Sequence, residues 1–206
     1  MTFQWLNIAK EIQSIAQAGL TFCDNKYDIE RYKQLRELSV KIMHEFTEDS
    51  MEKIYHLFAE EEGYQTPKVD IRGVVFRNGK ILMIQETIDG LWSLPGGWAD
   101  VNYSPFEIAA KEIREEAGLD VIPLKLLAVF DKMKNPEHLP DKYHVYKMFI
   151  LCKDSGQEAK TGMETLNVDW FLRNNIPPLS LPRVTSSQIK IMFEYYDNPM
   201  KSVMCD

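Results

Sequence analysis

The sequence predicts an α/β or α+β layer fold that follows a small all-α N-terminal domain. Residues 1–62 contain no proline and have apolar residues at helical spacing, among them Leu6, Ala9 and Ile12. After Pro67 the pattern changes to alternating strand-like runs with helical segments between them. The change places a boundary in the short segment around Gly63, so domains are expected at residues 1–63 and 64–206.

Three helices are predicted in the N-terminal domain, at about 2–18, 28–46 and 50–62. Side chains that accept hydrogen bonds from exposed backbone N–H groups suit the helix starts, and glycine suits the helix ends. The candidate starts are Asn25, Asp28 and Ser50, and the candidate ends are Gly19 and Gly63.

Strands and helices are mixed in the second domain. The Asn78-Gly79 pair tolerates positive φ and predicts a two-residue hairpin turn between the first two strands. Strands are expected at about 69–77, 80–86, 91–94, 121–131, 143–152 and 166–172, with helices at about 104–117 and 184–196.

The net charge of -7 argues against broad binding to DNA or to an anionic membrane, because both attract basic surfaces. No apolar run approaches the roughly 18 residues of a membrane-spanning helix, so a cytoplasmic protein is expected. The three cysteines form no CxxC pair and the four histidines show no ligand spacing. Any metal ion is therefore expected to have oxygen ligands.

The segment from Gly97 to Leu119 carries the strongest local signals in the chain. Ser104 suits the position before a helix, Pro105 suits its first turn, and Glu107 completes a capping box with Ser104. Gly118 supplies the left-handed residue expected just after the helix end. These signals predict a helix with well-defined ends.

This helix carries an apolar stripe and an acidic one. At about 100° per residue, Glu112, Glu115 and Glu116 share one arc, and Lys111 and Arg114 lie on other arcs. A divalent ion is then the expected counter-charge, and carboxylate oxygens favour Mg²⁺ or Mn²⁺ over zinc. A solvated acidic helix face is the alternative. The stripe expected to pack against the sheet comprises Phe106, Ala110, Ile113 and Ala117.

Gly96 and Gly97 precede this helix and lack side-chain bulk, so their backbone groups could approach the same ion or a phosphate. An ion facing such a backbone suits phosphoryl chemistry. On the first strand, the planar fork of Arg72 could bind a phosphate or a base edge. A surface arginine that pairs along the strand is the alternative for Arg72.

The segment resembles the Nudix box, G-x5-E-x7-R-E-U-x-E-E-x-G-U, in which U is aliphatic. The match begins at Gly97, includes Glu112, Glu115 and Glu116, and ends at Gly118-Leu119. Tyr103 replaces the first glutamate of the box and Lys111 replaces its arginine. In the family these two positions brace the loop and the helix, so the pair is interpreted as a coordinated structural variant.

The resemblance implies an α+β Nudix αβα sandwich with a mixed β-sheet. It implies hydrolysis of a nucleoside diphosphate derivative to a nucleoside monophosphate and a phosphorylated second product, with glutamates Glu112, Glu115 and Glu116 binding Mg²⁺ or Mn²⁺. Flanking similarity extends to a subgroup of ADP-ribose or CDP-choline pyrophosphatases and leaves both substrates open. Members of this group often place a glutamate before the final strand, where Glu164 stands. Glu164 could hold a water or act as general base beside Glu115 and Glu116, or be an ordinary loop residue.

The N-terminal domain is too small to be a stable unit alone, so a homodimer is expected, with this domain supporting the interface and the substrate pocket. Three alternatives to the pyrophosphatase stay open. A nucleotide sensor without catalysis would be expected to have an eroded glutamate set, and an isoprenoid isomerase would need a cysteine near the box. Action on RNA ends uses the same chemistry.

Overall fold

The computed structural model describes residues 2–139 and 141–206. The chain forms two compact units. One contains the residues up to Pro67 together with Asp141–His144, and the other contains Lys68–Leu139 and Val145–Asp206. None of the helices in the described part of the chain combines the length and apolarity that crossing a bilayer requires.

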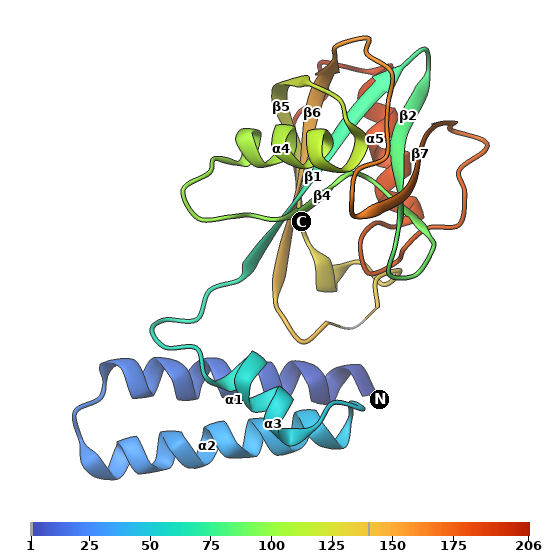
Figure 1. Cartoon of the computed structure of the whole chain (residues 1–206). Helices are drawn as coiled ribbons and strands as arrows, with labels where there is room; N and C mark the ends of the chain where they lie inside the picture. The colour runs from blue at the N-terminus through green and yellow to red at the C-terminus, as the bar shows by residue number, and fades with distance from the viewer. Residues whose placement is uncertain (1, 140) are drawn as a thin grey trace. The chain divides into compact units, whose positions relative to one another are not determined.

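The first unit is built on two long helices that pack against each other, α1 (Thr2–Phe22) and α2 (Lys26–Glu45) (Figure 1). A short helix α3 (Met51–Ile54) continues into one π-helical turn, η1 (Tyr55–Ala59). Burial of apolar side chains from all four elements holds the unit together. Its core comprises Leu6, Ala9, Val40, Met43, Ile54, Phe58 and Ala59.

Local signals explain most of these helix ends. The Asn25 side chain accepts hydrogen bonds from the N–H groups of Tyr27 and Asp28, and Ser50 caps α3. The predicted end of α1 at Gly19 is wrong, because α1 continues to Phe22. A Cβ at Gly19 would lie 2.4 Å from the Tyr32 ring, so this glycine allows α1 and α2 to approach closely instead of ending α1.

The second unit contains a mixed eight-stranded sheet with the order β3-β2-β1-β6-β5-β8, in which β4 also pairs with β1 and β7 with β2. The β1–β6 and β5–β8 pairs are parallel, and the other pairs are antiparallel. The strands are β1 (Lys68–Arg77), β2 (Lys80–Glu86), β3 (Trp92–Ser93), β4 (Gly96–Trp98), β5 (Val121–Asp131), β6 (Val145–Asp154), β7 (Thr165–Leu172) and β8 (Met204–Cys205).

Two helices cover the opposite faces of this sheet. On one face, α4 (Pro105–Ala117) packs through Ile108, Ala109 and Ile113. On the other, α5 (Ser186–Asp197) packs through Ile189, Met192 and Phe193. Figure 1 shows the sheet between the two helices. This arrangement confirms the predicted α+β αβα sandwich with a helical N-terminal part.

The hairpin prediction is confirmed, because Asn78 and Gly79 both have positive φ, 50° and 78°. The predicted strands did not include the strand that the structure has at Gly96–Trp98. Gly96–Trp98 forms β4, which lies antiparallel to β1 with Gly97 opposite Ile71 and Gly96 opposite Arg72. A strand this short depends on its neighbour for its hydrogen bonds and has no periodic pattern of its own.

The capping box of α4 is complete in the structure: the Ser104 hydroxyl accepts from the Glu107 N–H, and the Glu107 carboxylate accepts from the Ser104 N–H. Replacing Ser104 by alanine should lower the free energy of unfolding by about 1 kcal/mol, because the Glu107 N–H loses the hydroxyl that accepts its hydrogen bond. Urea denaturation measures the loss. The Ser104→Asp variant retains an acceptor and should keep most of the stability; equal losses in both variants would contradict the capping role.

Candidate functional site

The buried face of α4 differs from the predicted stripe. Phe106 is 39% exposed, and the buried residues of α4 are Ile108, Ala109, Ile113, Glu116 and Ala117. The helix is therefore rotated toward its acidic arc. As a result Glu116 lies within the packed contact between α4 and the sheet, where few carboxylates are found.

Glu116 is hydrogen-bonded to β4 (Gly96–Trp98), which is called the glycine strand below. Its Oε2 accepts a hydrogen bond of 2.7 Å from the Gly96 N–H, and the residue is 9% exposed. Burial raises the pKa of Glu116 to about 7, although the charge of Arg72 and the Gly96 N–H favour the ionised form. A carboxyl group that titrates near neutrality inside a polar pocket is typical of a functional site.

Both glycines of this strand permit close approach. Gly96 has φ +144°, and a Cβ there would lie 2.0 Å from the Ile71 carbonyl oxygen, so only glycine fits. A Cβ at Gly97 would lie 3.1 Å from Oε2 of Glu112. The two glycines thus place bare backbone beside two glutamate side chains, and their approach to an ion or a phosphate stays a prediction.

The ammonium group of Lys111 lies where the sequence did not predict it. Its ammonium lies 3.4 Å from Glu112 Oε1, 3.3 Å from Glu115 Oε2 and 3.1 Å from Asp100 Oδ2. The expectation that Lys111 lies away from the glutamates is wrong, because its flexible four-carbon stem reaches back over the acidic arc. Arg114 does lie apart, in an ion pair with Asp120.

These contacts decide how the three glutamates are arranged. Lys111 holds Glu115 at the exposed side of α4, whereas Glu116 faces Gly96. Within residues 2–139 and 141–206, no three His, Cys, Asp or Glu side chains are grouped closely enough to bind one ion. The three glutamates, which were expected to share one arc of the helix, are therefore not grouped around one point in this arrangement, and their binding of a metal ion stays a prediction.

The donor set nevertheless fits a hard divalent cation. Burial raises the pKa of Glu112, with the charge of Lys111 opposing the shift, and burial also raises the pKa of Glu116. Raised pKa values at two neighbouring carboxylates show that ionising both of them costs free energy without a further counter-charge. Carboxylate oxygens are the ligands that Mg²⁺ and Mn²⁺ favour.

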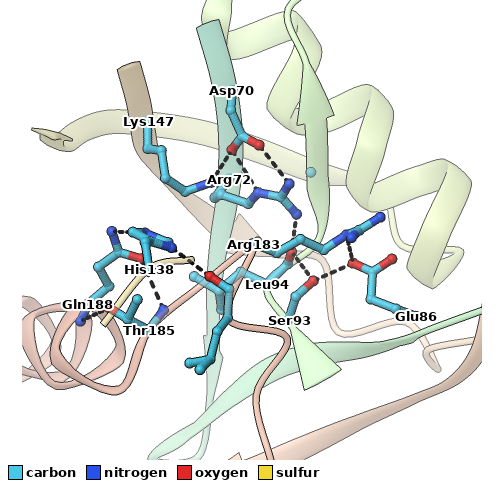
Figure 2. Close-up of polar contacts among 12 residues, drawn as sticks. Asp70, Arg72, Glu86, Ser93, Leu94, His138, Lys147, Arg183, Thr185 and Gln188 are labelled. Atoms are coloured by element: carbon cyan, nitrogen blue, oxygen red, sulfur yellow. Dashed lines mark hydrogen bonds and ion pairs between the residues drawn. The ribbon is translucent and has the colours of Figure 1, made fainter. Parts of the chain in front are cut away.

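Arg72 lies next to this site, on β1, directly opposite Gly96 in the β1–β4 pair. It is 3% exposed, so it is not the surface residue that was considered as an alternative. Its Nε and Nη2 donate to the two carboxylate oxygens of Asp70, each at 2.8 Å, and its Nη1 donates to the Leu94 carbonyl at 3.1 Å. Figure 2 shows this fork, with Lys147 on the other side of Asp70. Its contacts connect β1 with the segment that enters the glycine strand.

Sequence reasoning missed a second polar group next to this one. Glu86 ends β2 and is 5% exposed; its Oε1 accepts from the Ser93 hydroxyl at 2.7 Å and lies 2.5 Å from Nε of Arg183 (Figure 2). The same Ser93 hydroxyl oxygen lies 3.0 Å from the Leu94 carbonyl oxygen that Arg72 contacts, so these two acceptors share its one proton. No motif spacing marks these residues, because they come together only when β3 and the segment before α5 pack side by side.

Glu164 is exposed in the turn before β7. This turn is attached to the end of α4: the Glu116 carbonyl accepts from the Gly162 N–H at 3.2 Å and from the Thr165 hydroxyl at 2.9 Å. A Cβ at Gly162 would lie 1.7 Å from the Glu115 carbonyl oxygen, so the turn and the helix touch. The structure places Glu164 near the glutamate end of α4 and records no contact between their carboxylates.

Two family models match the chain. Residues 3–58 match a UDP-X-like N-terminal oligomerisation domain, and residues 66–194 match the NUDIX domain. The chain is also similar to Bacillus subtilis (strain 168) YjhB, a protein provisionally named an ADP-ribose pyrophosphatase. The two are 44% identical over 203 residues, which are 98% of this chain and 97% of YjhB.

Solved structures give the same grouping. The structure of an ADP-ribose pyrophosphatase from Streptococcus suis 89-1591 has 40% sequence identity and a TM-score of 0.62, over 68% of this chain and 100% of that one. The structure of a UDP-X diphosphatase has 28% identity and a TM-score of 0.64, over 100% of this chain and 99% of that one. The second match includes the helical N-terminal part.

The raised pKa of Glu116 makes stability depend on pH. Because the folded state holds the proton up to a pH of about 7 and the unfolded state releases it near 4.5, the stability contributed by the protonated group is lost as pH rises between these values. The Glu116→Gln variant lacks this loss. In EDTA it should therefore gain stability relative to the wild type across this range, by up to roughly 3 kcal/mol.

Urea denaturation at a series of pH values measures this difference. Glu115→Gln is the matched control, because Glu115 is an exposed neighbour on the same helix. A difference between Glu116→Gln and the wild type that stays constant from pH 4.5 to 7 would show that Glu116 is ionised throughout.

Proposed function

The chain belongs to the Nudix hydrolase family and is a hydrolase of phosphoanhydride bonds; from this premise we propose that it hydrolyses ADP-ribose to AMP and ribose 5-phosphate with Mg²⁺ or Mn²⁺. The observation that carries the proposal is the placement of Glu112 and Glu116 against the bare backbone of Gly96 and Gly97. Two relatives of 44% and 40% identity are named as ADP-ribose pyrophosphatases, which supports this substrate.

Each residue has a proposed part. Glu112, Glu115 and Glu116 would hold the metal, which supplies charge neutralisation and activation of water when bound. The N–H groups and small size of Gly96 and Gly97 would allow the diphosphate to approach. Arg72 would hold the segment before this strand in place through its hydrogen bond to the Leu94 carbonyl. A water molecule attacks phosphorus, the bond from phosphorus to the bridging oxygen breaks, and Glu164 or one of the box glutamates accepts the proton of the water.

UDP-linked substrates are a second candidate. The solved UDP-X diphosphatase matches this chain from end to end, and the family model of the N-terminal part is UDP-X-like. The relatives are thus named for substrates with different nucleobases, whereas cleavage of a diphosphate linkage is common to their names. CDP-choline and RNA ends stay predictions that the same assay tests.

The test is to incubate the protein with each of four substrates and to identify the products: ADP-ribose, a UDP-sugar, CDP-choline and RNA with a 5′-triphosphate end. Release of AMP from ADP-ribose should be the fastest reaction. EDTA should abolish it. Glu116→Gln should lower kcat on the order of 100-fold, since it removes a proposed metal ligand. Glu107→Gln is the matched control, because glutamine also completes a capping box and should leave kcat unchanged.

Full activity of Glu116→Gln would show that the site is assigned wrongly. Faster hydrolysis of the UDP-sugar than of ADP-ribose would favour the second candidate. The Glu164→Gln variant tests the base separately: a general base contributes about 10²–10⁴-fold to the rate, whereas an ordinary loop glutamate contributes nothing.

We propose further that the chain forms a homodimer through residues 1–63, while residues 64–206 carry the active site. The N-terminal part matches an oligomerisation domain. Apolar side chains stay exposed on both long helices, including Ile15 at 53% and Leu38 at 50%. Exposed apolar residues gathered on one small unit are typical of an interaction surface.

Sedimentation at micromolar concentration should give a dimer for the wild type. The Ile15→Glu variant should shift the equilibrium toward the monomer, because a charge at an apolar interface must be desolvated. Asn174→Asp, an exposed change in the second unit, alters the net charge by the same −1 and is the control. A monomeric wild type would contradict the dimer, and a dimer unchanged by Ile15→Glu would move the interface away from this residue.

A further inference from the structure

A continuous chain of polar contacts runs beneath the glycine strand, from β6 to the segment before α5. In each link the two polar heavy atoms are 2.5–3.1 Å apart, and the Leu94 carbonyl is the central acceptor. Figure 2 shows the whole chain. In order, its members are Lys147, Asp70, Arg72, Leu94, Ser93, Glu86 and Arg183.

The charges in this chain are unequal. Three cations, Lys147, Arg72 and Arg183, face two carboxylates, Asp70 and Glu86. Burial alone would raise the pKa of Asp70, but the charges of Arg72 and Lys147 outweigh it and hold that pKa well below its usual range. Both carboxylates are thus committed to internal pairs, and the seven members together carry one more positive than negative charge. Outside this chain of contacts, the charge of Glu116 acts on Arg72, and Asp89 interacts with Arg183.

An anionic ligand can reach the positive side chains only at one end of this chain of contacts. Lys147 is 1% exposed and Arg72 is 3% exposed, so both are closed off from solvent. The Arg183 side chain is 26% exposed, whereas that of its partner Glu86 is 7% exposed. Arg183 is therefore the member of this chain through which a ligand can reach the positive charge.

Arg183 is also held rigidly. The backbone before it pairs with β3: the Trp92 N–H donates to the Pro178 carbonyl at 3.0 Å, and the Ser180 N–H donates to the Trp92 carbonyl at 2.8 Å. The Arg183 N–H then donates to the Ser180 carbonyl at 2.8 Å. These bonds constrain the backbone at Arg183, and the ion pair with Glu86 orients its side chain, so less conformational entropy is lost on binding a ligand.

The guanidinium group has hydrogen-bonding capacity left. Arg183 faces Glu86 through Nε, and no acceptor for its Nη1 or Nη2 is recorded among residues 2–139 and 141–206. Asp89 is a more distant carboxylate, and its nearer partners are the Ser180 hydroxyl and the Leu91 N–H. A planar guanidinium with both terminal nitrogens available matches two oxygens of one phosphate group.

The position of Arg183 is next to the proposed active site. Its partner Glu86 influences the pKa values of both Glu116 and Arg72. Ser93, which holds Glu86, is followed directly by Leu94 and the glycine strand. Arg183 thus belongs to the same electrostatic environment as the box glutamates, although it lies far from them in the sequence.

We propose that Arg183 is a substrate-binding residue whose guanidinium, oriented by Glu86 and Ser93, binds the phosphate oxygens of the nucleoside diphosphate substrate. This inference rests on the proposed pyrophosphatase function. In it, Glu86 and Ser93 are positioning residues, because they act on the substrate through Arg183. The box glutamates bring negative charge to the cleavage site, and Arg183 supplies positive charge to the anionic substrate.

The experiment compares three variants by steady-state kinetics with ADP-ribose and by calorimetric titration with inorganic pyrophosphate in Mg²⁺. Arg183→Gln should raise KM, and should weaken pyrophosphate binding, on the order of 10- to 100-fold, since a hydrogen-bonded charge is lost. Arg183→Lys keeps the charge without the fork and should fall between the wild type and Arg183→Gln. Arg173→Gln is the matched control, because it removes an arginine from the exposed ion pair with Asp197; it should leave both quantities unchanged.

Thermal unfolding of each variant separates binding from support. A lower Tm for Arg183→Gln with unchanged KM and unchanged pyrophosphate affinity would overturn the proposal, because Arg183 would then only stabilise Glu86. If Arg183→Gln does not fold, the comparison of Arg183→Lys with the wild type decides instead. Weaker pyrophosphate binding by Arg183→Lys supports the proposal, and unchanged binding overturns it. Should ADP-ribose prove not to be a substrate, a selective loss of pyrophosphate binding in Arg183→Gln would still support the anion site, and no binding by the wild type would refute it.

Discussion

The hydrogen bond from the Gly96 N–H to the buried Glu116 carboxylate is the constraint on which the rest of the second unit depends. To reach this N–H, α4 must turn its acidic arc toward the sheet, and β4 must approach β1 so closely that Gly96 has no room for a side chain. The cost of burying a carboxyl group is offset by the packing of Ile108, Ala109 and Ile113 on the same face. Apolar burial thus holds a chemical group where solvation alone would not leave it.

A second layer of polar contacts supports the same strand from below. Arg72 donates to the Leu94 carbonyl, the Ser93 hydroxyl lies 3.0 Å from the same oxygen, and the Gly73 N–H donates to the Pro95 carbonyl at 2.8 Å. The segment that leads into the glycine strand is therefore fixed on both sides by partners that solvent does not reach. Such buried networks specify one geometry, because each unpaired member would carry a desolvation penalty. The base of the site is buried, and its more accessible parts are Lys111, Glu115 and the Glu164 turn.

The sequence predicted the features that depend on residues close together in the chain. The capping box at Ser104 and Glu107 and the Asn78-Gly79 turn are local, and the Nudix glutamates have a fixed spacing on one helix. Features that need a partner from elsewhere were missed or misjudged. The strands β4 and β8 exist through pairing with β1 and β5, and the Glu86–Arg183 contact requires two distant segments to pack together. Helical spacing placed Lys111 correctly as a Cα position, but it could not show where a long flexible side chain would place its charge.

The contacts of Lys111 have a consequence for how the site is occupied. In the structure this ammonium already lies between Glu112, Glu115 and Asp100, so the carboxylates have an internal counter-ion. A metal that binds to Glu112 and Glu115 would have to displace Lys111, and loading would then be an exchange of one cation for another. Because the displaced group stays tethered nearby, it would compete for the same oxygens throughout turnover. The lysine at this box position would thus trade metal affinity for readily reversible occupancy, and it would keep the acidic helix folded when no ion is bound.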